Sequence, residues 1–179
     1  IVVAERKPEI VDSQGVVNTP KNIADIIVKT TLAPLFSDEK FTEWDSYRIA
    51  DICCGSGNFL LSAYEFIINR YIEYYMKNSL DMAIQKGLLI SDVGNNFKLS
   101  YEKKREILRN NIWGVDIDIL AVEVAKFSLL IKLIEDSSLY EMESFAKNNN
   151  CRILPSLDNN IKNGNSLVDE KYIEFNSNI

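Results

Sequence analysis

Residues 48–63, with the sequence RIADICCGSGNFLLSA, constrain the fold more than any other segment. The apolar run at 49–54 predicts a buried strand, the GSG sequence at 55–57 predicts a tight turn, and a helix is expected from Asn58 to about Lys77. Glycines let the backbone turn sharply and let a ligand approach without meeting a Cβ atom. The start of the helix adds free N–H groups and a partial positive charge. This succession of strand, turn and helix is typical of α/β sheets that bind a nucleotide or another cofactor.

The glycine turn differs from two common phosphate-binding sequences. A dinucleotide-binding turn would have a third glycine at position 60, where this chain has Leu60. The GK[ST] sequence of nucleoside-triphosphate loops does not follow the turn either. These differences argue against NAD, FAD and nucleoside triphosphates as ligands.

Length and composition exclude several classes of protein. The chain has 179 residues, enough for one domain of ordinary size. It has no histidine, the commonest metal ligand and general base, and its three cysteines form neither a metal-site spacing nor a disulfide framework. We expect a cytoplasmic protein, because no signal peptide is visible and charges interrupt the longer apolar stretches that could span a membrane. A chain that begins with Ile1 is expected to be a piece of a longer protein.

The charge distribution gives no sign of a nucleic-acid-binding face. The net charge is −6, whereas a domain that grips nucleic acid by itself usually has a basic face. The cations Lys103, Lys104, Arg105 and Arg109 alternate with acids in a helix that Ser100 is expected to cap, so we interpret them as a solvated face. The tyrosines of the helix at 58–77 are interpreted as packing residues rather than as a base-stacking platform. If DNA or RNA is the substrate, the surface that grips it is expected elsewhere.

Two further strands are expected along the chain. Residues 112–115, IWGV, predict a buried strand that ends at Asp116, and 160–168 contain a third strand that ends at the GNS sequence 164–166. Between them a helix is expected to about Ile134, with Asp118 as its N-cap. Its apolar repeat consists of Leu120, Val124, Phe127, Ile131 and Ile134. A second stripe of small residues, which we expect close to a sheet, consists of Ala121, Ala125 and Ser128.

Three polar residues each have two interpretations from the sequence. Thr19, before Pro20 and a helix expected to reach Leu32, is either a plain N-cap or a cap that faces the ligand turn. Asp116 is either a ribose-binding acid at a strand end or a second acid that caps the following helix. It lies 61 positions after Gly55, against roughly 20 in the usual arrangement, and an insertion at about 78–111 must account for the excess. Asn165 belongs either to an ordinary turn or to an adenine-binding edge. The residues alone leave these alternatives open.

Four segments, in order, resemble the N6-adenine-specific DNA methyltransferases of restriction–modification systems. GVVNTPKNIADIIV resembles that family's G-x-[FY]-x-T-P motif and the helix that follows it. IADICCGSGNFLLSA is similar to D-P-A-C-G-S-G-N-F-L, with Ile52 and Cys53 in place of Pro-Ala. NIWGVDIDILAVEVAKFSL is similar to N-I-x-G-V-D-I-D-x-x-A-V-E-[IL]-A-[KR]-L-S-L, and NNIKNGNSLV is similar to N-I-x-x-G-N-S-L. The resemblance covers about 15–168, almost the whole chain.

The resemblance implies a Rossmann-like, doubly wound parallel α/β sheet of the class that uses S-adenosylmethionine, incomplete in this chain. Residues 1–179 would be the cofactor-binding part of a methyltransferase domain, with a helical insertion at about 78–111. Asp116 would bind the ribose hydroxyls, Ile117 would pack on the adenine and Asn165 would bond the adenine edge. Thr19 would meet the methionine carboxylate. The rest of the amino-acid moiety would be held by Asp51 and by the backbone of Cys54, Gly55 and Gly57.

One motif of the family is missing from these residues. The [DN]-P-P-[FY] sequence holds a flipped adenine for methylation, and none of the four prolines here is followed by a second. We find no target-recognition domain either, so no catalytic residue is assigned, and duplex DNA is expected to bind through regions outside this chain. A nuclease domain or subunit is a possible partner that the resemblance implies. The alternatives are a methyltransferase that acts on RNA or protein, or a non-catalytic, methyltransferase-like interaction module.

Overall fold

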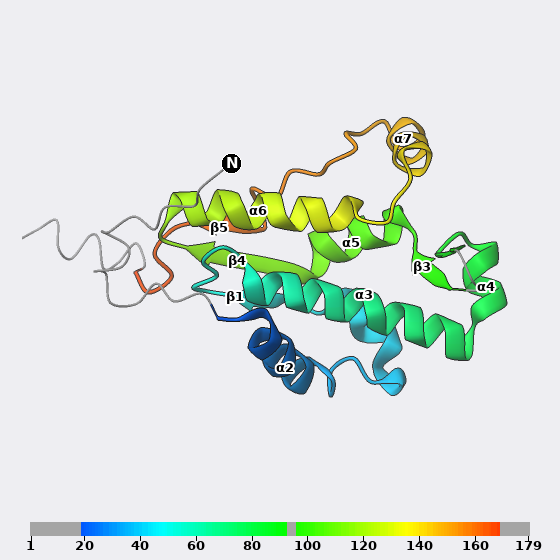
Figure 1. Cartoon of the computed structure of the whole chain (residues 1–179), viewed down its shortest axis with the longest axis horizontal. Helices are drawn as coiled ribbons and strands as arrows, with labels where there is room; N and C mark the ends of the chain where they lie inside the picture. The colour runs from blue at the N-terminus through cyan, green and yellow to red at the C-terminus, as the bar shows by residue number, and fades with distance from the viewer. Residues whose placement is uncertain (1–18, 93–95, 169–179) are drawn as a thin grey trace, which may run out of the picture.

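A computed structural model describes residues 19–92 and 96–168, and its centre is a parallel sheet (Figure 1). The strands β1 (Ile49–Asp51), β4 (Ile112–Asp116) and β5 (Ile161–Asn163) pair in the order β1-β4-β5. Asp51 is in register with Gly114, and Asp116 is in register with Asn163. Parallel pairing therefore brings the carboxyl ends of all three strands to one edge. The structure confirms a mixed α/β fold with parallel strands.

Three helices lie along this sheet and follow the predicted order. They are α2 (Lys21–Leu32), α3 (Asn58–Asn78) and α6 (Ile119–Ile134). In Figure 1, α3 lies between α2 below and α6 above, and it contacts both of them. The ends of α2, α3 and α6 agree with the sequence prediction to within about two residues.

The first strand is shorter and more exposed than the sequence predicted. A buried strand over 49–54 was wrong, because β1 ends at Asp51 and the side chain of Ile52 is 57% exposed. Cys54, three residues after the end of β1, is again hydrogen-bonded to β4, because its N–H donates to the carbonyl of Val115 at 3.0 Å. Within the described residues β1 pairs on one side only, with β4. Ala50 in this strand is exposed.

The segment between α3 and β4 contains the expected helical pieces and an unexpected hairpin. The helices are α4 (Leu80–Gln85) and α5 (Tyr101–Asn111), and Ser100 caps α5 as predicted by accepting from the N–H of Lys103. Between them, β2 (Leu89–Ser91) and β3 (Phe97–Leu99) pair antiparallel. The turn that the sequence predicted at 94–96 lies mostly outside the described residues.

The prediction of a solvated cationic face on α5 was wrong for two lysines. Lys103 and Lys104 are 6% and 5% exposed. The Lys103 ammonium lies 2.7 Å from an oxygen of Asp45, and the Lys104 ammonium donates to the carbonyl of Glu135 at 2.6 Å. Burial lowers the pKa of Lys104 from its ordinary value. Both lysines therefore bond within the fold and are not exposed to an anionic partner.

The core next to α3 is rich in aromatic side chains. The 3-10 helix η1 (Asp38–Ser46) buries Trp44 completely, although the sequence predicted only a polar connector there. Tyr71 packs edge-on against Trp44, with 5.1 Å between the ring centroids, and Tyr74 stacks on Phe41 at 3.7 Å. The interpretation of the α3 tyrosines as packing residues is therefore confirmed.

The face of α6 that packs on the fold includes part of the small-residue stripe that the sequence placed close to a sheet. The buried residues of the helix are Val122, Ala125, Leu129 and Leu133. Ala125 belongs to that stripe, whose other members, Ala121 and Ser128, are half-buried. The larger apolar repeat beginning at Leu120 is mostly exposed.

The remaining helix, α7 (Leu139–Asn148), follows α6 in a stretch that the sequence predicted to be partly helical. No helix within 19–92 and 96–168 is both long and apolar enough to cross a membrane. Residues 15–18 of the first motif lie outside the described residues.

Candidate functional site

The glycine turn has the geometry that the sequence predicted. Gly55 and Gly57 have φ angles of +52° and +88°, in the region that favours glycine. The N–H of Gly57 donates to the carbonyl of Cys54 at 2.8 Å and closes the turn, and Gly57 is the N-cap of α3. A Cβ atom on Gly57 would lie 2.9 Å from the Cβ atom of Ala125, so glycine is also required for α3 and α6 to approach each other.

Asp116 connects this turn to the end of β4. One carboxylate oxygen accepts from the N–H of Gly55 at 2.7 Å, and the other accepts from the N–H of Asp118 at 2.9 Å. A carboxylate has about four acceptor positions, so each oxygen keeps one for a further donor. The two alternatives for Asp116 are thus compatible, because it supports the start of α6 and still faces the glycine turn.

Asp118 is the N-cap of α6, as the sequence predicted. Its side chain accepts from the N–H of Leu120 at 2.8 Å. Asp116 and Asp118 therefore differ in structural role although they are two positions apart, since only Asp116 bonds to the glycine turn.

Replacing Asp118 by alanine is expected to lower stability without weakening the binding of a ligand at the turn. The lost cap should reduce the free energy of unfolding by about 0.5–2 kcal/mol. Denaturant unfolding monitored by circular dichroism measures this change. A larger effect of Asp118→Ala than of Asp116→Ala on ligand affinity would show that the assignment at this strand end is shifted.

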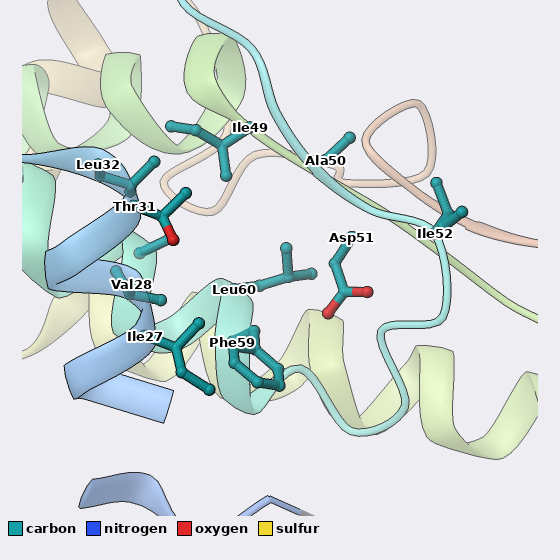
Figure 2. A pocket seen from close by; sticks show the side chains of 11 residues that line it. Ile27, Val28, Thr31, Leu32, Ile49, Ala50, Asp51, Ile52, Phe59 and Leu60 are labelled. Atoms are coloured by element: carbon teal, nitrogen blue, oxygen red, sulfur yellow. The ribbon is translucent and has the colours of Figure 1, made fainter. Parts of the chain in front are cut away.

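Asp51 lies at the end of β1 and lines a mainly apolar cavity of about 310 Å³. Figure 2 shows its carboxylate in the cavity together with Phe59 and Leu60, while residues of α2, including Val28 and Thr31, form the facing wall. One Asp51 oxygen accepts from the N–H of Cys53 at 3.1 Å. The cavity lies between α2, α3 and the open side of β1.

Cys54 lies close enough to both acids of the site to interact with them electrostatically. Burial, followed by the nearby carboxylates of Asp51 and Asp116, raises the pKa of the Cys54 thiol to about 11. The thiol is therefore protonated at neutral pH and is not an activated nucleophile. The same carboxylates give this part of the site a negative potential, which favours a cationic ligand group.

Thr19 is not the N-cap of α2, so that prediction was wrong. The helix begins at Lys21 and Pro20 is its N-cap, because the Pro20 carbonyl accepts from the N–H groups of Ile23 and Ala24. The Thr19 carbonyl instead accepts from the side-chain amide of Asn58 at 3.0 Å. Thr19 consequently lies next to the start of α3, the end of that helix that carries the glycine turn.

Hydrogen bonds from backbone and side-chain amide groups connect the end of β5 to the site. The N–H of Gly164 donates to the carbonyl of Asp116 at 2.9 Å. Asn165 follows in an exposed turn, where its side chain accepts from the N–H of Leu167 at 3.0 Å, and the Ile117 side chain is 73% exposed. Asn165 therefore follows directly on the residue that bonds to Asp116, while its own side chain closes the turn at Leu167.

Sequence reasoning missed two asparagines that hold these strand ends in place. The Asn163 amide donates to the carbonyls of Asp116 and Ile117 at 3.1 and 2.9 Å. The Asn160 amide donates to the carbonyls of Arg109 and Ile112, both at 2.9 Å. Their sequence signal was an amide on each side of Ile161 and Lys162, but amides are common in loops and this pattern is weak.

Comparison with known proteins identifies the family. Residues 39–174 match the model of the DNA-methyltransferase domain of MmeI. The chain belongs to this family. The match includes the glycine turn, Asp116 and Asn165, whereas Thr19 and the α2 wall of the cavity precede the matched residues.

Two curated relatives agree with this assignment to the MmeI-type domain. The type II restriction enzyme and methyltransferase RM.Eco57I of Escherichia coli is 38% identical over 168 residues, which are 94% of this chain and 16% of that protein. The putative type II restriction enzyme and methyltransferase RM.MjaORFECS2P of Methanocaldococcus jannaschii is 34% identical over 128 residues, 70% of this chain and 9% of that protein. The chain thus spans less than a fifth of either relative, and it represents a methyltransferase-domain segment of restriction–modification enzymes.

No group of three or more cysteine and acidic side chains within 19–92 and 96–168 is arranged to hold a metal ion. The acids of the site are instead bonded to backbone N–H groups, as described for Asp51 and Asp116.

Proposed function

We propose that this chain is the S-adenosylmethionine-binding part of a site-specific DNA methyltransferase that methylates adenine at N6. The observation that carries the proposal is the Asp116 carboxylate, held at the carboxyl end of β4 and bonded to the glycine turn across 61 positions of sequence. Ligands of open α/β sheets bind at this edge, outside the carboxyl ends of the strands. The adenine-N6 specificity rests on the resemblance of the four motifs to that family.

The residues at this edge suit the chemical groups of the cofactor. The remaining acceptor positions of Asp116 suit the two ribose hydroxyls, and the exposed Ile117 side chain offers an apolar surface to adenine. Asp51 supplies a carboxylate for the amino group of the methionine moiety, beside the backbone of Cys54, Gly55 and Gly57. Asn165 would bond the adenine edge, and Thr19, beside Asn58, would meet the methionine carboxylate.

When bound, the cofactor supplies a methyl group on a positively charged sulfur. The side chains of this chain would bind and orient the cofactor. The carboxylates of Asp51 and Asp116, which both act on Cys54 electrostatically, favour the positive charges of the ammonium and the sulfonium. The target adenine, the duplex DNA and any nuclease would engage parts of the polypeptide outside this chain.

The open side of β1 supports the rest of the proposed architecture. A strand edge in a soluble protein is usually paired or covered, and β1 pairs only with β4 among the described residues. We place the further strands of a doubly wound sheet at this edge, next to the apolar cavity. Residues 1–179 would then form the cofactor-binding part of the domain, with 78–111 as an insertion.

The ligand is tested by titrating S-adenosylmethionine and its demethylated product into the complete gene product by calorimetry. Replacing Asp116 by alanine should weaken binding by about 1–3 kcal/mol, because hydrogen bonds to a charged group are lost. That loss corresponds to roughly 5- to 150-fold in affinity. Asp118→Ala is the matched control and should leave the affinity nearly unchanged.

The titration, together with an assay of methyl transfer by the complete protein, tests each part of the proposal. No binding by the folded complete protein would contradict the proposal and favour a non-catalytic interaction module. Binding without N6-methyladenine in the nucleosides of a treated duplex, but with methyl transfer to RNA or protein, would refute the DNA substrate. If the wild-type protein and Asp116→Ala bound S-adenosylmethionine with equal affinity, only the proposed role of Asp116 would be refuted.

A further inference from the structure

The helix α6 carries an apolar stripe that nothing in the described structure covers. The stripe consists of Leu120, Val124, Phe127 and Ile131, whose side chains are 48–65% exposed. The opposite face of the helix is buried against the rest of the fold. A helix that is apolar on both faces is normally enclosed on both, so the exposed stripe is suited to dock a further element.

The spacing of the stripe indicates what kind of element would cover it. Its residues follow one another by four, three and four positions. This is the a/d spacing of a coiled-coil seam, in which each apolar side chain packs into a hole on a facing helix. An amphipathic helix with the same spacing is therefore the best complement.

A groove beside the stripe and the pairing of the nearby charges define the chemistry of the partner. Phe127 also lines a groove of about 320 Å³, together with Leu130 of α6 and residues of the loop before β5, and about half of this lining is polar or charged. The Lys126 ammonium lies 3.0 Å from Glu123 and 2.7 Å from Asp158. Since Lys126 is already paired, the facing helix needs apolar residues in the seam and no acid to pair with this lysine.

The size of the stripe argues against a second copy of the chain. Four large side chains exposed to this extent present on the order of 400 Å² of apolar surface, whereas a stable interface buries roughly 800 Å² per partner. A helix on the same polypeptide avoids this requirement, because tethering raises its effective concentration to about the millimolar range. In the relatives named above, more than four-fifths of the polypeptide lies outside the matched segment.

We propose that the α6 stripe is the docking seam for an amphipathic helix from another part of the same polypeptide. The helix would bury Leu120, Val124, Phe127 and Ile131 and reach the edge of the groove beside Phe127. The seam would fix the cofactor-binding part against the rest of the enzyme. This inference does not depend on the identity of the cofactor.

Photo-crosslinking in the complete gene product tests the seam. A photoreactive p-benzoylphenylalanine replaces Phe127 in one variant and Tyr140 in the control, since Tyr140 is aromatic, lies on α7 and is 82% exposed. At Phe127 we expect a crosslink within one polypeptide, at several times the yield seen at Tyr140. Mass spectrometry should place it on a segment with apolar residues in a four–three spacing.

A second variant tests the seam without crosslinking. Phe127→Asp in the complete gene product should raise the hydroxyl-radical oxidation rates of Leu120 and Ile131 several-fold. The same change in residues 1–179 alone should leave those rates unchanged. A crosslink between two copies, a yield no higher than at Tyr140, or equal oxidation of the stripe in the long and short chains would each overturn the proposal.

Discussion

Residues 1–179 alone are expected to transfer no measurable methyl group to DNA, while the complete gene product does. Cofactor binding supplies the methyl donor, but transfer also requires the target amine to be positioned against it. Positioning contributes up to about 7–11 kcal/mol of the barrier, and this chain has no Pro-Pro loop to hold the base. The base must also leave the duplex, at a cost of a few kcal/mol that contacts to the flipped base and the DNA normally offset.

The charges of the chain lead to the same expectation for DNA binding. The net charge is −6, and the described structure uses the α5 cations Lys103 and Lys104 internally. Affinity for duplex DNA should therefore be weak and should fall further with added salt. A radiolabelled-methyl assay on duplex DNA of mixed sequence, run beside the complete protein, measures the difference in activity. Incorporation by the short chain at a rate near that of the complete protein would show that the catalytic residues lie within 1–179.

Local signals in the sequence predicted the backbone of the site well. The glycine turn, the Asp118 cap and the strand that ends at Asp116 each depend on residues within a few positions of one another, so short-range physics decides them. The local prediction failed at Thr19, because the carbonyl of Pro20, rather than the Thr19 side chain, serves the first N–H groups of α2. The Thr19 carbonyl instead accepts from the side chain of Asn58, 39 positions away, and no local sequence pattern encodes this contact.

The burial of single side chains was predicted correctly where small residues marked a close approach. Ala125 belongs to the stripe that we expected close to a sheet, and it approaches Gly57 so closely that a larger residue at either position would separate the two helices. The larger error concerns Lys103, which was expected in solvent because its partner Asp45 is 58 positions away in sequence. The β2–β3 hairpin was missed because each strand has only three residues.

The contact between Gly57 and Ala125 leads to the largest stability change that we expect from a single substitution. Gly57→Ala should lower the free energy of unfolding by about 2–5 kcal/mol, of which roughly 1–2 comes from an alanine at a φ of +88° and the rest from overpacking. The new Cβ atom would lie 2.9 Å from the Ala125 Cβ atom and 3.3 Å from its Cα atom, so α3 and α6 would have to separate. Since Gly57 is also the N-cap of α3, the displacement should weaken binding at the glycine turn as well.

Gly87 provides a matched control for the backbone part of this effect. It also has a positive φ angle, +66°, but a Cβ atom there would meet nothing within 4 Å. Gly87→Ala should therefore cost only about 1 kcal/mol, and denaturant unfolding of both variants separates strain from overpacking. The double variant Gly57→Ala with Ala125→Gly should recover part of the loss, because it removes the atom in closest contact, although a glycine inside α6 costs about 1 kcal/mol by itself. If Gly57→Ala were as stable as Gly87→Ala, α6 would have moved to accommodate the added methyl group at little cost. The close approach of α3 and α6 would then not be the reason for a glycine at position 57.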